Sequence, residues 1–303
     1  MALLLSVLEQ GMIYGILALG VYITYKILDF PDLTVDGSFP FGAAHTVRLI
    51  NGFGVPAILT LPIAFLGGAL VGICTGLIHV KLKVRDLLSG IIMMTGLYTI
   101  NLWVAGSGYV AIFDKENIFN NSFVNSITPG FLVNFKNMII IFLITMVAKY
   151  LLDWYMSTKS GFLLRAAGDN DTIVTSLGVD KGLVKIVGLS IANGLVSLSG
   201  CIYAQQQRSF EISIGTGAVV IGLASVIIGT SLFKKLTFVK TTTAVIIGSI
   251  LYKGCVAIAI RFFDPQSMKL ITAVLFLVIL VISMERKQKA KGMAAGQKGG
   301  KNA

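Results

Sequence analysis

The stretch AILTLPIAFLGGALVGICTGLI, residues 57–78, decides the fold of this chain. It contains no charged side chain, and about 20 apolar residues in a helix are enough to cross the hydrocarbon core of a bilayer. Similar runs recur along the 303 residues, which are 55% hydrophobic and 13% charged, with a mean hydropathy of +0.84. Soluble domains carry about 25% charged residues. We therefore predict an all-α, polytopic membrane protein, because lipid-exposed backbone must pair internally and continuous apolar runs do not fit barrel strands.

Outward from that stretch, the hydropathy pattern predicts about nine transmembrane segments, within a range of eight to ten. Apolar runs of this length, separated by polar residues, are typical of helices that cross a bilayer in succession. The predicted segments cover residues 3–25, 37–50, 55–79, 87–105, 137–155, 183–204, 215–232, 241–261 and 265–284.

The second segment, residues 37–50, differs from the others. Its 14 residues form only about 21 Å of helix, whereas the hydrocarbon core is about 30 Å thick. Pro31 and Asp32 precede it, and Pro40 and Gly42 interrupt it. We predict a short helix that is broken or tilted and is buried among the other spans, where the freed backbone groups find partners.

The basic residues predict the orientation. Most of the 25 Lys and Arg residues fall in alternate loops and in the last 19 residues, and cytoplasmic loops are the ones enriched in Lys and Arg. The N-terminus is then outside and the C-terminus in the cytoplasm. This divides the chain into a transmembrane domain (1–284), with an external loop (106–136) and a cytoplasmic loop (156–182), and a basic, disordered cytoplasmic tail (285–303). The net charge of +11 follows from these loops and does not indicate nucleic-acid binding.

Motifs for catalysis are missing from the sequence. It has no G-x-x-x-x-G-K-[ST] phosphate loop, no H-E-x-x-H zinc pattern and no G-x-S-x-G nucleophile elbow. Its three cysteines lack metal-ligand spacing. We expect no enzymatic activity, no metal and no cofactor in this chain. Lys253 is an ionisable residue deep in a predicted span, where such residues are often functional. An ion-coupled secondary transporter, a channel and a membrane-embedded enzyme remain alternatives.

The first informative motif is DLTVDGSF, residues 32–39, followed by Gly42. It places two carboxylates and two hydroxyls at the start of a short helix. One interpretation is that Asp36 or Ser38 simply caps that helix, since Asp and Ser are good N-cap residues. The other is that this irregular entry shapes a substrate path. The candidate path residues are Asp32, Thr34, Asp36, Gly37, Ser38 and His45.

The second motif is GFLLRAAGDN, residues 161–170, followed by Gly178. It lies in the long loop predicted to be cytoplasmic, and helical potential continues after it. The pattern predicts a compact helix–turn–helix, which is either a docking surface or a solvated connection.

Three glycines, Gly68, Gly72 and Gly76, recur every four residues in the stretch quoted first. Small residues at this spacing let two membrane helices approach closely. They predict either packing within the chain or association with a second subunit.

Both motifs, in this order and separation, resemble the permease subunits of bacterial ABC importers of the branched-chain amino acid and ribose type. The resemblance extends from about Gly11 to Ile282, and the first motif is most similar to a subgroup associated with tryptophan/tyrosine import. It implies a type II ABC importer-like fold in the bacterial inner membrane. It also implies the residues that couple the permease to an ATPase: Gly161, Arg165, Ala166, Gly168, Asn170 and Gly178.

The same resemblance implies the partners and the activity. Two permease copies, most simply a homodimer, would enclose the path for a small solute. An external solute-binding protein would deliver this solute, and cytoplasmic ABC ATPase subunits would bind ATP and Mg²⁺. An aromatic or branched-chain amino acid is the expected solute, with a sugar or nucleoside as the alternative.

Overall fold

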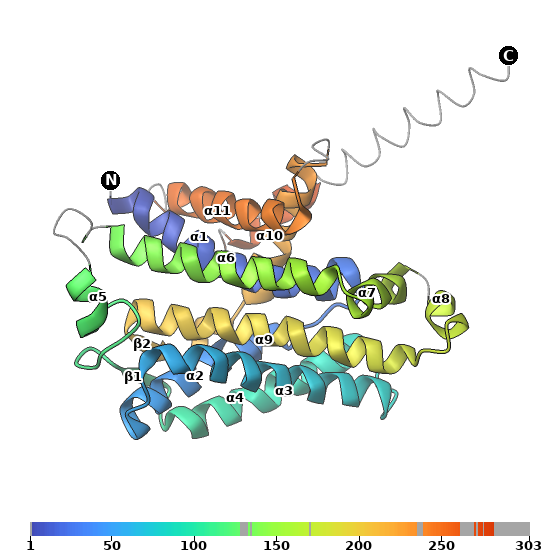
Figure 1. Ribbon diagram of the computed structural model, residues 1–303, viewed down its shortest axis with the longest axis horizontal. Helices are drawn as coiled ribbons and strands as arrows, with labels where there is room; N and C mark the ends of the chain where they lie inside the picture. The colour runs from blue at the N-terminus through green and yellow to red at the C-terminus, as the bar shows by residue number, and fades with distance from the viewer. Residues whose placement is uncertain are drawn as a thin grey trace, which may run out of the picture.

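The computed structural model describes residues 2–127, 133, 135–169, 171–234, 239–260, 270, 272–274 and 276–281. Its long helices run side by side along one axis (Figure 1). The α-helices are α1 (Ala2–Val21), α2 (Val35–Phe53), α3 (Thr60–Val80), α4 (Asp86–Ala105), α5 (Ser122–Ile127), α6 (Lys136–Met156), α7 (Lys159–Asp169), α8 (Asp171–Ser176), α9 (Lys181–Gln207), α10 (Ala218–Leu232) and α11 (Thr241–Ala259). The described residues also form shorter elements. These are the π-helix η1 (Tyr22–Ile27), the 3-10 helices η2 (Ala57–Leu59) and η4 (Ile212–Gly215), and the strands β1 (Tyr109–Ala111) and β2 (Ser209–Glu211).

Seven helical stretches among the described residues are long and apolar enough to cross a membrane. Their ends lie within about three residues of the predicted segments. They are Leu3–Ile27, Ala57–Val80, Asp86–Ala105, Lys136–Met156, Lys181–Gln207, Ile212–Leu232 and Thr241–Ala259. Length and apolar composition thus identify seven spans among the described residues, fewer than the predicted count of about nine. The second predicted segment is less apolar than the seven, and the ninth, residues 265–284, falls largely outside the described residues.

The prediction that the second segment breaks at Pro40 and Gly42 is wrong. Helix α2 is continuous over 19 residues and about 28 Å long. Pro40 lies within α2 and, as a proline, has no backbone N–H. The helix therefore loses only the hydrogen bond that this group would have donated to the carbonyl oxygen four residues earlier. The irregular backbone lies earlier, over residues 28–34, between η1 and α2. Most of these seven residues are buried, so their backbone faces protein rather than lipid.

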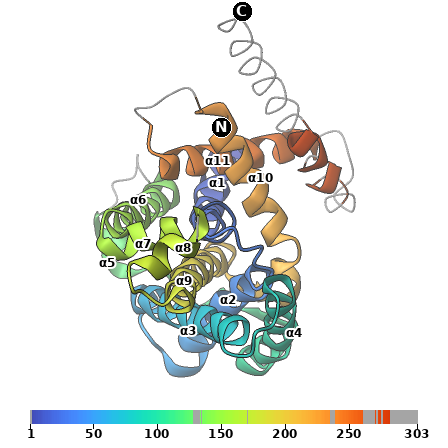
Figure 2. The same ribbon diagram turned by 90° about the vertical axis from the view of Figure 1, so that its right-hand side faces the viewer.

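Helix α9 is the centre of the bundle. It packs on α1, α2 and α3, as the end-on view shows (Figure 2). Gly68, Gly72 and Gly76 lie on α3 against α9: a Cβ on Gly72 would overlap the carbonyl group of Leu189, and one on Gly76 would come within 2.9 Å of the Ile186 side chain. These glycines therefore face a helix of the same chain.

The two ends of the bundle differ. One end carries α7 and α8 and is called the α7–α8 end below (Figure 1). The other, the β1–β2 end, carries α5 and two short antiparallel strands in which Val110 pairs with Phe210. The all-α prediction does not include these two strands. The loop predicted to be external, residues 106–136, contains both β1 and α5.

Candidate functional site

The first motif folds into a buried polar junction between α2 and the middle of α9. Asn193 Nδ2 donates a hydrogen bond to Asp32 Oδ2 (2.8 Å), and Ser38 Oγ donates one to Asn193 Oδ1 (2.7 Å). The backbone N–H of Thr34 donates to Asp32 Oδ1 (2.9 Å). Asp32 is 5% exposed and the other three are not exposed at all. Each polar atom of this junction has a partner, as burial in a low-dielectric interior requires.

Asp36 does not cap its own helix, contrary to one of the two interpretations of the motif. Its carboxylate accepts hydrogen bonds from the backbone N–H groups of Gly217 (3.0 Å) and Val219 (2.8 Å), at the start of α10. Thr34 is the N-cap residue of α2, and its side chain makes no capping bond. Ser38 does not cap α2 either, because its hydroxyl is bonded to Asn193. The carboxylate thus satisfies unpaired donors of a second helix and complements its dipole.

Two further contacts fix the start of α2 against α3 and α4. The hydroxyl oxygens of Thr34 and Thr75 lie 3.1 Å apart, and Asn101 Nδ2 donates to the carbonyl oxygen of Gly37 (3.1 Å). Asn101 Oδ1 is buried without a hydrogen-bond partner among the described residues. Sequence reasoning missed Asn193, Asn101 and Thr75. The available signal was a polar residue in the middle of an otherwise apolar run.

His45, the remaining candidate path residue, lies apart from this junction. Its ring is half-buried, 4.0 Å from the ring of Phe41 between centroids, and Nδ1 is 3.1 Å from the Phe41 carbonyl oxygen. The structure therefore brings five of the six candidates together at the start of α2 and places His45 further along the same helix.

The second motif forms α7 and α8, the predicted helix–turn–helix. Two of its glycines permit close backbone contacts. A Cβ on Gly161 would come within 2.6 Å of the Met156 Cα at the end of α6, and one on Gly168 would overlap the carbonyl oxygen of Ile27 at the end of η1. These contacts place α7 directly against the ends of two membrane-length helical stretches.

Exposed apolar side chains and an exposed arginine lie on α7 and just after α8. Phe162 and Leu177 are 60% and 64% exposed, and Arg165 is exposed with its guanidinium carbon 5.9 Å from the Phe162 ring centroid. Ala166 is half-buried, and Gly178 has a φ of 72°, which favours glycine. Asn170, the last candidate coupling residue, lies outside the described residues.

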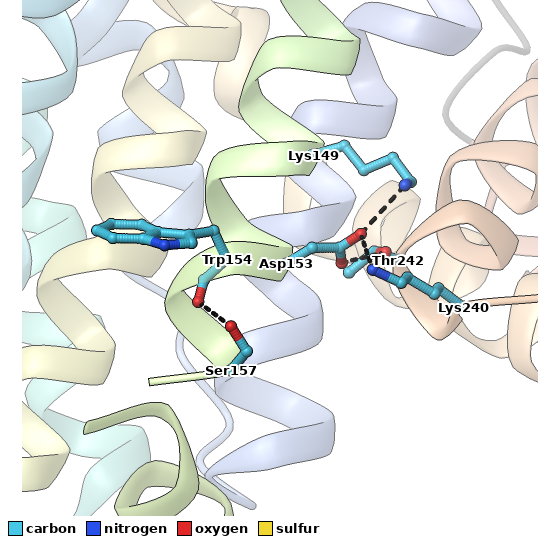
Figure 3. A network of polar contacts seen from close by, with 6 residues as sticks. All are labelled: Lys149, Asp153, Trp154, Ser157, Lys240 and Thr242. Carbon is cyan, nitrogen blue, oxygen red and sulfur yellow. Dashed lines mark hydrogen bonds and ion pairs between the residues drawn. The ribbon is translucent and has the colours of Figure 1, made fainter. Parts of the chain in front are cut away.

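A charged network joins α6 to α11 at the same end of the bundle (Figure 3). Asp153 Oδ2 lies 3.1 Å from Lys149 Nζ and 3.4 Å from Lys240 Nζ, and Asp153 Oδ1 accepts a hydrogen bond from Thr242 Oγ1 (2.7 Å). The side chains of Lys149 and Asp153 are 7% and 10% exposed, whereas Lys240 is 67% exposed. None of these residues belongs to a motif recognised in the sequence.

An apolar groove of about 650 Å³ lies between α3, α6 and α9. Leu66, Leu143 and Leu151 line it and are each at least 60% exposed, so the groove opens on the outside of the bundle. Its lining offers almost no polar group, and burying a charged solute against such a surface is unfavourable. This groove is therefore unsuited to a polar solute.

Known proteins resemble this chain along nearly its whole length. Residues 3–284 match the family described as branched-chain amino acid transport system / permease component. The chain is 41% identical to a tyrosine transport system permease protein of Clostridioides difficile, over 91% of this chain and 90% of that relative. It is 26% identical to a probable branched-chain amino acid transport permease of Methanocaldococcus jannaschii, over 71% of this chain and 70% of the relative.

A ribose import permease of Escherichia coli is also 26% identical, over 75% of this chain and 68% of the relative. No solved structure matches the chain. The family match, the extent of the 41% identity and the seven membrane-length helices lead to one conclusion. The chain belongs to the permease family of branched-chain amino acid transport systems, the membrane components of ABC-type transporters.

Proposed function

We propose that this protein is the permease subunit of an ATP-driven importer that carries an aromatic or branched-chain amino acid into the cytoplasm. The observation that carries the proposal is the 41% identity, over about nine-tenths of both chains, to a tyrosine transport permease. The buried polar junction at the start of α2 supports it, because polar groups inside a membrane bundle are costly and commonly mark a solute pathway.

In this proposal the α7–α8 end faces the cytoplasm and docks on a separate ATPase subunit. The exposed Phe162, Arg165 and Leu177 supply the docking surface. The backbone contacts of Gly161 and Gly168 carry its motion to α6 and η1. ATP and Mg²⁺ bind the ATPase, and the permease itself performs no chemical step.

The remaining arrangement follows from the same orientation. The β1–β2 end, with the loop of residues 106–136, faces outward in the inner membrane and receives the solute from an external binding protein. A second copy of the permease completes the path, with the start of α2 and His45 along it. Residues 1–284 form the membrane domain, and residues 285–303 form a basic cytoplasmic tail.

Reconstitution tests the proposal directly. Proteoliposomes that contain the permease, its ATPase and ATP inside, with the binding protein outside, should accumulate radiolabelled L-tyrosine or L-leucine against a gradient. Vesicles with the permease alone and an ion gradient should not. Uphill uptake without the ATPase would contradict the proposal and favour a secondary transporter. Uptake of ribose but of neither amino acid would favour sugar import, the activity named for the Escherichia coli relative.

Reversal of one charge tests the coupling surface. Arg165→Glu should leave membrane insertion intact and abolish solute-stimulated ATP hydrolysis by the complex, because an exposed cation in the docking surface becomes an anion. Lys81→Glu, an exposed lysine at the same end of the bundle, is the matched control and should retain the activity. Normal stimulated hydrolysis by the Arg165→Glu complex would reject the coupling assignment.

A further inference from the structure

A cationic side chain points into an aromatic cluster in the interior of the bundle. Lys253 Nζ, from α11, lies 3.5 Å from the centroid of the Tyr14 ring on α1. The Tyr14 ring lies 5.5 Å from that of Phe39 on α2 and 5.9 Å from that of Tyr203 on α9, and Phe39 and Tyr203 are 5.5 Å apart. Side chains from four helices, α1, α2, α9 and α11, thus meet around the Tyr14 ring.

The depth of this ammonium group makes it unusual. Tyr14 is 12 residues from Ala2 and 13 from Ile27, or roughly 18 Å and 20 Å along the first span. The charge therefore lies near mid-depth, and the Tyr14 contact directs it away from the nearer end of α11. Ionisable residues at this depth are costly and are commonly functional.

The ammonium group of Lys253 lacks an anionic partner within the part of the chain that the structure describes. No carboxylate of those residues forms an ion pair with it, and the Tyr14 ring stabilises only one face of the charge. An ammonium group has three N–H donors. The ammonium group of Lys253 thus has N–H donors left for a ligand.

We propose that Lys253 and the rings of Tyr14, Phe39 and Tyr203 form a subsite for an amino acid with a flat side chain. The carboxylate of the solute pairs with Lys253, and its ring packs on Tyr203. Tyr14 (6% exposed) and Phe39 (0%) form the floor, whereas Lys253 and Tyr203 are partly exposed and can be reached. This inference rests on the proposed function. A neutral sugar would leave the cation unpaired, so the subsite favours a carboxylate-bearing solute.

The probes are L-tyrosine and tyramine, which differ only by the carboxylate. Their binding to the permease–ATPase complex in nanodiscs is measured for the wild-type protein and for Lys253→Met. The wild-type complex should bind L-tyrosine more tightly than tyramine by on the order of tenfold or more, the contribution of a charge-assisted hydrogen bond. Lys253→Met should reduce L-tyrosine affinity to that of tyramine and leave tyramine affinity unchanged. Lys81→Met is the control and should alter neither.

A second variant keeps the inference testable if Lys253→Met fails to assemble, as judged by size-exclusion chromatography. Tyr203→Leu removes the ring but retains the charge, so it should weaken L-tyrosine and tyramine together. Three results would overturn the subsite. In the first, Lys253→Met loses affinity for L-tyrosine and tyramine equally; in the second, either variant keeps its L-tyrosine affinity. In the third, a wild-type complex transports L-tyrosine but does not bind it. Failure of ATP-dependent amino-acid uptake by the wild-type complex would instead overturn the proposed function.

Discussion

Asn193 shows how a single residue organises the interior of this permease. Its side-chain amide accepts from Ser38 and donates both to Asp32 (2.8 Å) and to the carbonyl oxygen of Leu189 (3.1 Å). It therefore joins the irregular segment before α2, the helix α2 and its own helix α9. Asp32 depends on this amide, because its other donors among the described residues both belong to Thr34, through the backbone N–H (2.9 Å) and the side-chain hydroxyl.

We expect Asn193→Leu to destabilise the protein by about 2–3 kcal/mol, since it leaves a buried carboxylate short of a partner. The measurement is the thermal unfolding midpoint of the purified permease in detergent. Asn51→Leu is the control, because Asn51 is exposed and makes one 3.2 Å bond to a backbone carbonyl. Similar midpoints for the two variants would show that the junction contributes little.

At the scale of elements, α2 is held by close contact as well as by hydrogen bonds. A Cβ on Gly37 would come within 2.9 Å of the Leu97 side chain and 3.2 Å of the Met94 Cα, both on α4. The backbone of Gly37 does not have a positive φ. The glycine is therefore required for the approach of α4 and not for an unusual backbone conformation.

Gly37→Val should separate α2 from α4, costing about 1–3 kcal/mol of stability through overpacking, and reduce solute uptake by the complex. Gly96→Val is the matched control on α4, because no heavy atom lies within 4 Å of the position of its added Cβ. The comparison uses the unfolding midpoint and initial uptake rates. Unchanged uptake by Gly37→Val would argue that the start of α2 does not shape the path.

At the scale of the whole molecule, the Asp153 network connects the α7–α8 end to the last described long helix. Asp153 belongs to α6, whose end contacts α7, and its contacts with Lys240 and Thr242 tie it to the start of α11. Lys149 is buried, and a buried charge is strongly destabilising when its counterion is removed. The network thus positions α11 relative to the helix pair that we propose to contact the ATPase.

Asp153→Ala should lower stability by about 3 kcal/mol or more, because it leaves Lys149 uncompensated. The double variant Lys149→Met/Asp153→Ala should recover most of that loss, since no buried charge remains. Asp114→Ala, at an exposed position, is the control. If the double variant unfolds at the same temperature as Asp153→Ala in thermal melts, the network has another role.

The amino-acid sequence alone predicts the membrane class, the positions of seven of the nine expected spans and the helical pair α7–α8. These depend on local properties: the length of apolar runs, the spacing of glycines and the helical potential of a short segment. Only the packing of the helices shows that Asp36 caps α10, that Asn193 bonds to Asp32, and that Lys253 contacts the Tyr14 ring. Each of these contacts joins residues more than 150 positions apart, and hydropathy sets the depth of a helix but not which neighbour it crosses or which face it presents.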